Sequence, residues 1–434
     1  MTRSEKLYKL NRAKQIIVLI SLLSLCLDAY RIVGLGTFSV TLSFLSLIAL
    51  IFVGLLEMDN GLYPDKKRLF ICALFALAIV ISVLFNLRIF NANSTMLYVV
   101  FLLVYLFSHH RTSDANMLKI LWVVNIVYTA LSLYGIYQFG AYIYNLPLSE
   151  IVIPGHMTPG YNTTDTISIG DFTIGRAHSI YLEPSTLSQF AAFAIIISFI
   201  LFGNKKIKIH WFIISVIINL LAMFMAVAGT GILAFGVAVL VFLFMCIKNR
   251  KYIALPIIFV IIVIAAVVFV FTSDMEIAEY IKGRIMELTS SQMSGGIRFV
   301  TPYLIANWVL STWFFGYSPG SDSYVIRYYQ KYHPGRNVTM FDSHAIASGY
   351  GKVATELGGL GLIGIVLLFM TLRKNSFYKY IFAFVLMIPF IGGNLLQPYL
   401  WILVALLNSS PREWLIYERT LPSWQTSEIA EIAA

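Results

Sequence analysis

Charged residues are scarce in this sequence. Asp, Glu, Lys and Arg supply 12% of the 434 residues, whereas an average soluble domain contains about 25%. A soluble enzyme of this length needs far more polar surface, so that class is excluded, and the 59% of hydrophobic residues also excludes intrinsic disorder. Cysteine is rare as well. Cys26, Cys72 and Cys246 all lie in apolar runs, which excludes a disulfide scaffold and a cysteine metal cluster.

Long hydrophobic runs are abundant instead. A helix needs about 20 mostly apolar residues to cross a hydrocarbon core about 30 Å thick. We find twelve candidate spans, and the short fourth and twelfth runs allow a range of ten to thirteen. The spans are Gln15–Val33, Phe38–Leu56, Leu69–Phe85, Ser94–Phe107, Met117–Gln138, Ser185–Phe202, His210–Ala228, Gly231–Ile247, Tyr252–Thr272, Ile346–Met370, Phe377–Gly392 and Leu395–Leu407. The sequence therefore predicts an all-α, polytopic membrane protein with about 12 transmembrane helices.

Lysine and arginine are distributed unevenly around these spans. Of the 31 in the chain, 21 fall in the termini, in the even-numbered connections or within three residues of these connections. Cytoplasmic segments carry such an excess, so we expect both termini to be cytoplasmic. The net charge of +10 follows from this topology and from anionic lipid headgroups, and it does not indicate nucleic-acid binding. The first apolar run lacks a small-residue cleavage site, which favours a retained helix over a signal peptide.

Two of the outer connections are long, Phe139–Ile180 and Ser273–Ala345. Loops of this length are usually functional, so we expect the working surface to face outward. Within the second, Met275–Leu288 is typical of an amphipathic surface helix, and Ile297–Phe315 of a re-entrant or interfacial helix pair. The predicted organisation is helices one to five in 1–138, the first outer loop in 139–180, helices six to nine in 181–272, the second outer loop in 273–345, helices ten to twelve in 346–408 and a cytoplasmic tail in 409–434.

Motifs for cofactors are absent from the sequence. The pair Gly351-Lys352 lacks the upstream glycine of a phosphate loop, and neither an Asp-x-Asp pair nor a His-Glu-x-x-His motif occurs. The sequence therefore indicates neither ATP nor a divalent metal, and we expect no cofactor.

Charged residues are expected at helix ends on the outer side. In GRAHSIYLEPSTLSQ, Arg176 and Glu183 lie in a loop that leads into a helix with Pro184 in its first turn. Glu183 is then near the positive end of that helix. Helix capping and a surface ion pair are the structural alternatives for these two residues. In SGGIR, Arg298 follows two glycines that let the backbone approach a ligand closely.

A polar periodicity marks the start of the tenth span. In FDSHAIASGYGKVATE, His344, Ser348, Lys352 and Glu356 recur every four residues and form one stripe if the segment is helical. Lys352 and Glu356 are expected to neutralise each other within the membrane. His344 is expected at the outer mouth of the stripe, either acting on a substrate or making a hydrogen bond at the helix start.

The same motifs resemble a family. GRAHSIYLEP, GGIRF followed by WVLSTWFFGYSPGSD, and DSHAIASGYGKVATELGGLGLIGIVLLF are similar to segments of the bacterial O-antigen polymerase and O-antigen ligase superfamily, of the Wzy and WaaL type. The resemblance covers Ser149 to Met370, and the first 140 residues match in hydropathy alone. The divergent, larger polymerase branch is the more similar of the two.

Site residues carry over from this resemblance motif by motif. Arginine ahead of a Glu-Pro pair corresponds to Arg176 before Glu183 and Pro184, a second arginine before a tryptophan and a Gly-rich turn corresponds to Arg298 with Trp308, Gly316 and Gly320, and the histidine that opens a helix corresponds to His344 with Glu356, Gly358 and Gly359. Many members carry a Ser-Arg pair where this chain reads Ala228-Gly229-Thr230-Gly231. That basic contact is therefore missing or supplied by another residue such as Arg31, Arg88 or Arg336.

What the resemblance implies is metal-independent, GT-C-like glycosyl transfer at the outer face of the bacterial cytoplasmic (inner) membrane. The donor and acceptor would be oligosaccharides on undecaprenyl pyrophosphate, polymerised into O-antigen or capsular polysaccharide. Arg176 and Arg298 would hold the departing pyrophosphate. His344 would be the general base, with Glu183 as the alternative. A chain-length regulator and a flippase are partners that such a polymerase implies, besides membrane lipids.

Substrate contacts are expected in the second outer loop. The segment YVIRYYQKYHPGR interleaves tyrosines with basic residues, which suits a glycan groove and equally an interfacial anchor. The predicted substrate-binding residues are Trp308, Arg327, Tyr328, Lys331 and Arg336, although packing on the bundle is the alternative for Trp308.

Two other functions remain open from the sequence. An O-antigen ligase uses the same donor and transfers the glycan to lipid A core, which these residues do not distinguish from polymerisation. A lipid-linked oligosaccharide flippase or another secondary transporter shares the twelve-span layout. Transporters usually show repeated halves and charges near the midplane, and neither is evident here.

Overall fold

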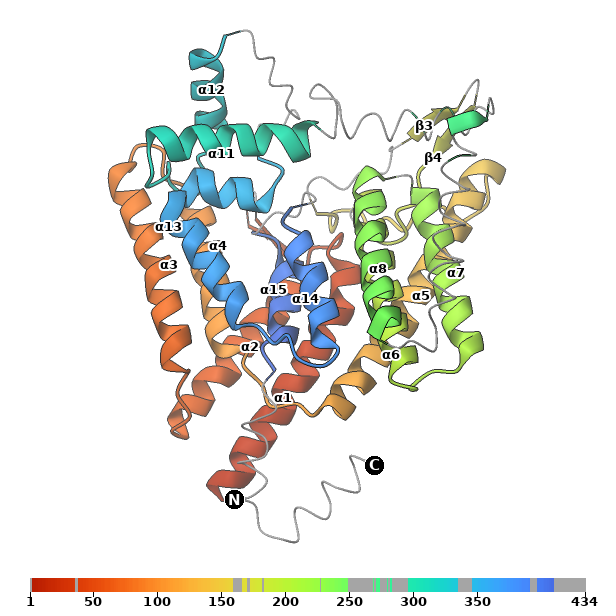
Figure 1. The fold of residues 1–434 in the computed structure, drawn as a ribbon, viewed down its shortest axis with the longest axis horizontal. Coiled ribbons are helices and arrows are strands. Elements are labelled where there is room, and N and C mark those ends of the chain that lie inside the picture. The colour runs from red at the N-terminus through yellow and green to blue at the C-terminus, as the bar shows by residue number, and fades with distance from the viewer. Residues whose placement is uncertain are drawn as a thin grey trace.

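The fold is that of a computed structural model, which describes residues 2–35, 38–158, 166–169, 172–181, 183–226, 228–248, 268, 271–273, 279, 282, 296–334, 346–390 and 396–409. Helices dominate these residues, which confirms the predicted all-α class (Figure 1). Within the described ranges, strands form two short antiparallel hairpins. β1 (Val33–Leu35) pairs with β2 (Phe38–Val40), and β3 (Thr166–Ile169) pairs with β4 (Phe172–Gly175).

The helices follow the predicted hydrophobic runs. In chain order they are α1 (Arg3–Ser24), α2 (Leu42–Asp59), α3 (Lys66–Phe85), α4 (Ala92–Phe107), α5 (Asp114–Tyr144), α6 (Pro184–Gly203), α7 (Ile209–Ala226), α8 (Gly229–Lys248), α11 (Thr301–Thr312), α12 (Asp322–Tyr332), α13 (Gly349–Thr371), α14 (Tyr378–Met387) and α15 (Pro398–Leu407), with short turns η1 (Leu25–Leu27) and η3 (Gly296–Val300). The predicted ninth span, Tyr252–Thr272, lies largely outside the described residues.

Seven of these helices are long and apolar enough to cross a membrane, namely α1, α2, α3, α5, α6, α7 and α13. Four more, α4, α8, α14 and α15, are apolar but shorter. A helix satisfies its own backbone hydrogen bonds, as a hydrocarbon environment requires. The chain is therefore a helical membrane protein, and a total of twelve spans stays a prediction.

Helix α6 is the most buried part of the bundle. Every residue from Phe190 to Leu201 is buried, and the helix packs against α5, α7 and α8. Hydrogen bonds between polar side chains link α5 to α6 and α7. Asn125 of α5 donates to Ser198 of α6 over 2.8 Å, and Ser132 of α5 donates to Asn219 of α7 over 2.7 Å. Such bonds link membrane helices that have no hydrophobic driving force to associate.

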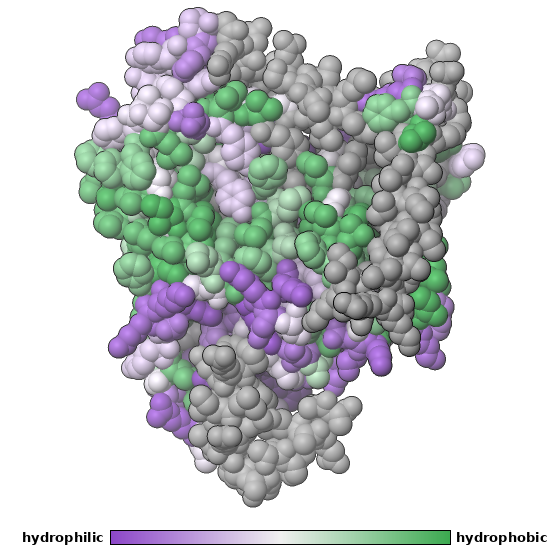
Figure 2. All heavy atoms as spheres, viewed as in Figure 1, coloured by the Kyte–Doolittle hydropathy of each residue, from purple (hydrophilic) through white to green (hydrophobic). Residues whose placement is uncertain are grey.

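The two ends of the bundle differ in what they carry. The β3–β4 hairpin, α11 and α12 lie at one end, which we call the outer end, and α1 begins at the opposite end (Figure 1). A hydrophobic belt separates hydrophilic residues at both ends (Figure 2). The described parts of both long connections therefore share one side, as the distribution of basic residues predicts. Which end faces the cytoplasm stays a prediction.

Three boundaries differ from the sequence-based expectation. α5 continues to Tyr144 over 31 residues, about 46 Å at 1.5 Å per residue, because a helix can extend beyond the apolar core into the interface. The first outer connection therefore begins at Asn145 and not at Phe139. Ser348 is the N-cap of α13 and not part of its stripe, since its hydroxyl accepts from the Gly351 amide. The predicted helix pair in 297–315 is a π turn followed by one helix, α11, which lies across the bundle (Figure 1).

Membrane orientation is testable by cysteine labelling. Ser323 on α12 and Lys206 between α6 and α7 are both exposed. Because most basic residues lie at the end opposite to α12, we expect Ser323→Cys to react in intact or outer-permeabilised cells with a maleimide that cannot cross the inner membrane. Lys206→Cys should react only after that membrane is disrupted. The reverse pattern would invert the orientation.

The buried side chain of His110 is expected to make the stability of the protein sensitive to acid. His110 lies between α4 and α5, accepts from the Thr112 hydroxyl at 2.6 Å through Nδ1 and donates Nε2–H to the Ala405 carbonyl at 3.2 Å. Burial, reinforced by the nearby charges of His109, Lys14 and Arg373, lowers the pKa of His110 to about 3. The unfolded chain binds this proton below about pH 6.5 and the folded chain does not, so stability falls as pH decreases from there, with a slope of up to about 1.4 kcal/mol per pH unit.

His110→Gln is expected to make thermal stability in detergent less dependent on pH between 6.5 and 4.5. His210→Gln, at an exposed position of α7, serves as the matched control and should leave the dependence unchanged. Equal slopes in the wild type and in His110→Gln would contradict the assignment.

Candidate functional site

Arg298 lies in the π-helical turn η3, which runs directly into α11. π-helical turns are rare overall, and those that occur are often found at functional sites. The turn is held against the start of α13, because Pro302 of α11 packs on Gly351, where an added Cβ would come within 2.8 Å of the proline ring. The arginine is therefore presented from a fixed backbone at the outer end of the bundle.

Glu183 is the N-cap residue of α6, with an extended backbone and Pro184 following as predicted. Its side chain makes no capping hydrogen bond to the helix amides, and it instead accepts the hydroxyl of Ser185. Capping is therefore not the role of this carboxylate.

Tyr399 interacts electrostatically with both of these predicted site residues. Tyr399 lies in the first turn of α15, close enough to Glu183 and Arg298 for the charges of both to act on it. Its ring packs edge-on against Phe190 of α6, with 6.3 Å between centroids. Glu183 and Arg298 are 115 residues apart in sequence, and the fold places both within electrostatic range of one tyrosine.

Arg176 has a different environment. Its Nε donates to the carbonyl of Ala226 at the end of α7, over 3.1 Å, and the adjacent Ala177 amide donates to Met225. A guanidinium that satisfies the last carbonyls of a helix stabilises that end. The structure thus gives Arg176 a positioning role between β4 and α7. A pyrophosphate contact by Arg176 stays a prediction.

The tyrosines of the second outer connection form an aromatic platform. On α12, Tyr324, Tyr328 and Tyr332 occupy successive turns, and the first two rings stack at 5.9 Å. Trp308 of α11 lies 5.7 Å from the Tyr328 ring and 6.3 Å from that of Tyr317. We use the term aromatic platform for these five residues. Both predicted aromatic contacts, Trp308 and Tyr328, belong to it.

The platform has a buried side and an exposed side. Val325, Ile326 and Tyr329 of α12 pack on Ile305 and Val309 of α11 in a small hydrophobic core. Arg327 and Lys331 are exposed on α12, one turn apart and beside the tyrosines. The combination of flat rings and cations predicted from the sequence is thus present on one surface, while packing also accounts for part of Trp308.

An ion network fixes the platform to the bundle. Lys352 of α13 lies 3.0 Å from Glu356, as its spacing predicts, and 2.5 Å from Asp322 at the start of α12. Glu356 also accepts from the Tyr98 hydroxyl and from the Gly320 amide, each over 2.7 Å. All three charged side chains are almost inaccessible to solvent. Asp322 is the member that sequence reasoning missed.

Two of the motifs that carry the family resemblance contact each other at Gly316 and Gly358. α13 is kinked at Gly358, whose φ of 66° favours glycine. The turn before α12 enters this kink, because an added Cβ at Gly316 would lie 2.5 Å from the Gly358 amide and from the Glu356 carbonyl. The Gly359 amide donates to Phe314 over 2.8 Å. The glycines of these motifs therefore have a structural explanation, the close approach of two backbones.

Comparisons with known proteins give no match on which to base a family assignment. The chain matches no family model and no curated protein. The resemblance to O-antigen polymerases therefore rests on the sequence motifs alone and stays a prediction.

Two predicted site residues, His344 and Arg336, lie outside the described residues. Of the alternatives for the missing family contact, Arg31 donates to the Gly155 carbonyl through Nε and Nη2, which ties the segment after α1 to the first outer connection. Arg88 lies in the α3–α4 turn.

Asp28 is a carboxyl at the outer end that the sequence did not single out. It follows η1 and accepts the hydroxyl of Ser43, and its backbone carbonyl accepts from Thr158. Burial raises the pKa of Asp28 to about 7, against the hydrogen bonds from Ser43 and Thr41 that lower it. A lone Asp at the end of the first apolar run was the available signal. This carboxyl can exchange a proton near neutral pH.

Proposed function

We propose that the chain polymerises undecaprenyl-pyrophosphate-linked oligosaccharide units at the outer face of the bacterial cytoplasmic membrane. The observation that carries the proposal is that Arg298 and Glu183 both lie within electrostatic range of Tyr399, at the same end of the bundle as the aromatic platform. A cation, a carboxylate and a flat aromatic surface are the groups that glycosyl transfer from a lipid pyrophosphate needs.

The first requirement is stabilisation of the leaving group. The bond between the anomeric carbon and the pyrophosphate oxygen breaks, and the lipid pyrophosphate departs with the electron pair and an added negative charge. Arginine remains protonated throughout and presents two parallel N–H groups to phosphate oxygens. Arg298, held on the rigid η3 turn, is the residue to which we assign this role, with Arg176 as a supporting cation.

The second requirement is a base for the acceptor. A sugar hydroxyl forms the new bond to the anomeric carbon and loses its proton to a side chain. His344 remains our first candidate because imidazole titrates near neutral pH. Glu183, at the start of α6, is the alternative, and Asp28, a half-buried carboxyl at the same end of the bundle, adds a third.

The third requirement is a surface for the glycan. The aromatic platform offers stacked rings to the apolar faces of sugars, and Arg327 and Lys331 offer donors at its edge. These residues lie on a helix fixed to the bundle by the Asp322–Lys352 ion pair, so the surface is preorganised.

Purified protein tests the activity directly. Incubated with lipid-linked repeat units in EDTA, it is expected to form polymer, because the proposed charge stabilisation uses arginine and not a metal. Loss of turnover in chelator, restored by magnesium, would contradict the arginine-based mechanism.

Deletion in the native host separates the alternatives. Loss of polymer with single repeat units retained, as seen on a gel of surface polysaccharide, is the result expected for a polymerase. Loss of all glycan-capped lipid A would instead assign the ligase reaction. Accumulation of repeat units on the cytoplasmic side would assign a flippase.

A further inference from the structure

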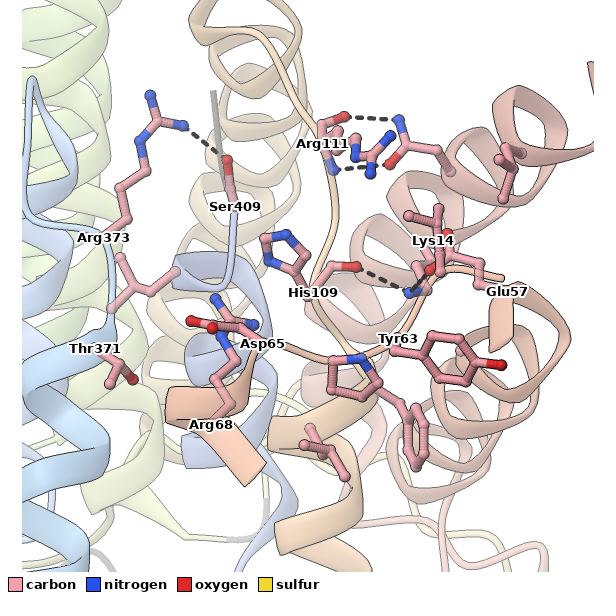
Figure 3. Close-up of a pocket in the computed structure, with 18 of the residues that line it drawn as sticks. Lys14, Glu57, Tyr63, Asp65, Arg68, His109, Arg111, Thr371, Arg373 and Ser409 are labelled. Carbon is pink, nitrogen blue, oxygen red and sulfur yellow. Dashed lines mark hydrogen bonds and ion pairs between the residues drawn. The ribbon is translucent and has the colours of Figure 1, made fainter. Parts of the chain in front are cut away.

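A pocket of about 620 Å³ opens at the end of the bundle opposite to the candidate site (Figure 3). Its walls come from α1, α2, α3 and the segments that follow α4, α13 and α15. Five lysine or arginine side chains line it, against two carboxylates, and His109 adds an imidazole. The pocket therefore has a positive charge balance at neutral pH, which remains when Asp114, bound to Arg373 from outside the lining, is included.

Two of the five cations hold the walls together. The Lys14 ammonium lies 2.6 Å from Glu57 of α2 and donates to the His109 carbonyl over 2.9 Å. Arg373 donates to Asp114 and to Ser409, and its guanidinium lies 3.7 Å from the centroid of the Tyr378 ring. These contacts fix the shape of the pocket, so that it exists without a ligand.

Arg68 and Arg111 reach the same space from different elements. Arg68 lies in the first turn of α3, and both arginines are near enough to Lys14 for their charges to interact with it. The backbone of Arg111 is clamped by Asn11 of α1, which accepts from its amide over 2.8 Å and donates to its carbonyl over 2.7 Å. In Figure 3 the two arginines and Lys14 lie around one hollow. Converging guanidinium groups are suited to bidentate binding of phosphate.

Exposed apolar residues lie close in sequence to residues that line the pocket. Phe70, two residues after Arg68, is 65% exposed, and Leu56, next to Glu57, is 51% exposed. The pocket also includes Leu62 and Leu106 in its lining. Hydrophilic residues meet the belt at this end of the molecule (Figure 2). A ligand held here by its phosphate would lie at headgroup depth, with exposed apolar side chains beside it.

We propose that this pocket binds the phosphate headgroup of an anionic membrane phospholipid, with Arg68 and Arg111 as the phosphate ligands. Positive-inside sorting alone places cations at this end, but it does not require them to line one preformed cavity. Basic pockets between membrane helices bind acidic lipid headgroups through such residues. The acyl chains would lie along the exposed apolar residues of α2 and α3. The inference is independent of the proposed glycosyl transfer.

Lipid titration of the full-length protein tests the proposal. Wild-type protein in nanodiscs of phosphatidylcholine receives increasing phosphatidylglycerol, and its melting temperature is followed together with the lipids retained in native mass spectrometry. We expect a saturable rise in melting temperature with one retained phosphatidylglycerol. Arg111→Gln and Arg68→Gln should each weaken the apparent affinity about tenfold or more, since each removes a charged hydrogen-bond donor.

Lys206→Gln is the matched control, because it removes an exposed cation outside the pocket, and it should behave as the wild type. Two variants are used so that a folding defect in one, seen in phosphatidylcholine alone, leaves the other informative. Equal lipid dependence in Arg111→Gln, Arg68→Gln and Lys206→Gln would overturn the site in favour of general surface attraction. The same saturable shift with soluble glycerol phosphate in phosphatidylcholine discs would overturn a lipid ligand and assign a soluble phosphate.

Discussion

Arg298→Lys is expected to lower the rate of polymer formation about a hundredfold or more while the protein stays folded. Lysine keeps the positive charge but loses the planar fork that binds two phosphate oxygens at once. Removing one oriented donor from a developing anion costs about 3 kcal/mol. The measurement is the initial rate with purified lipid-linked repeat units, alongside melting temperature in the same detergent.

Arg176→Lys supplies the contrast. Because Arg176 donates to the end of α7, its replacement is expected to lower the melting temperature as well as activity. A wild-type rate in well-folded Arg298→Lys would remove Arg298 from the mechanism and leave the pyrophosphate without its assigned ligand.

The choice of base is tested by a further comparison. His344→Ala is expected to slow transfer while donor binding persists, with partial recovery at alkaline pH as acceptor hydroxyls lose their protons more readily. A wild-type polymer yield from folded His344→Ala would shift the assignment to Glu183, or to Asp28 if Glu183→Gln is also active.

Lys352→Met is expected to destabilise the protein by about 3 to 5 kcal/mol, the range for breaking a buried ion pair by removing one partner. The substitution leaves the carboxylates of Asp322 and Glu356 next to each other without their shared cation. Reduced melting temperature and poor recovery from the membrane are the measured outcomes. Lys331→Met, an exposed position on α12, is the matched control and should change stability little.

A compensated variant distinguishes charge from packing in this network. Adding Asp322→Asn and Glu356→Gln to Lys352→Met removes both unpaired carboxylates and should restore most of the lost stability, because replacing a whole buried ion network is far less costly than breaking it. Failure of the triple variant to recover would show that the shape of the lysine side chain, and not its charge, is what α13 requires.

Hydropathy predicted most of the described helices because each long apolar run must pair its own backbone groups in lipid. Spacing along one helix also predicted the Lys352–Glu356 pair, since residues four apart share a face. The ion pair of Asp322 with Lys352 could not be predicted from such spacing. Its approach to Lys352 depends on the turn at Gly316 entering the kink at Gly358, a contact between segments about 40 residues apart with no local pattern.

The candidate site shows the same division. The sequence indicated Glu183 and Arg298 individually, as charges beside helix starts, and the fold brings both within electrostatic range of Tyr399. Arg176 looked equivalent to Arg298 in sequence, but only the three-dimensional arrangement reveals the Ala226 carbonyl that it binds. Local patterns thus identify candidate groups, while tertiary contacts separate those that converge from those that support the framework.

The attachment of α12 has a mechanical consequence. Asp322 joins the first turn of α12 to Lys352, and Glu356 holds the preceding turn through Gly320, so the aromatic rings and α13 form one stiff unit. Under the proposed function, a growing polysaccharide that needs more room would displace this whole unit as a rigid body relative to α6, rather than bend α12 alone. Spin labels on α12 and α13 would keep a constant separation during turnover, whereas labels on α12 and α6 would report the opening.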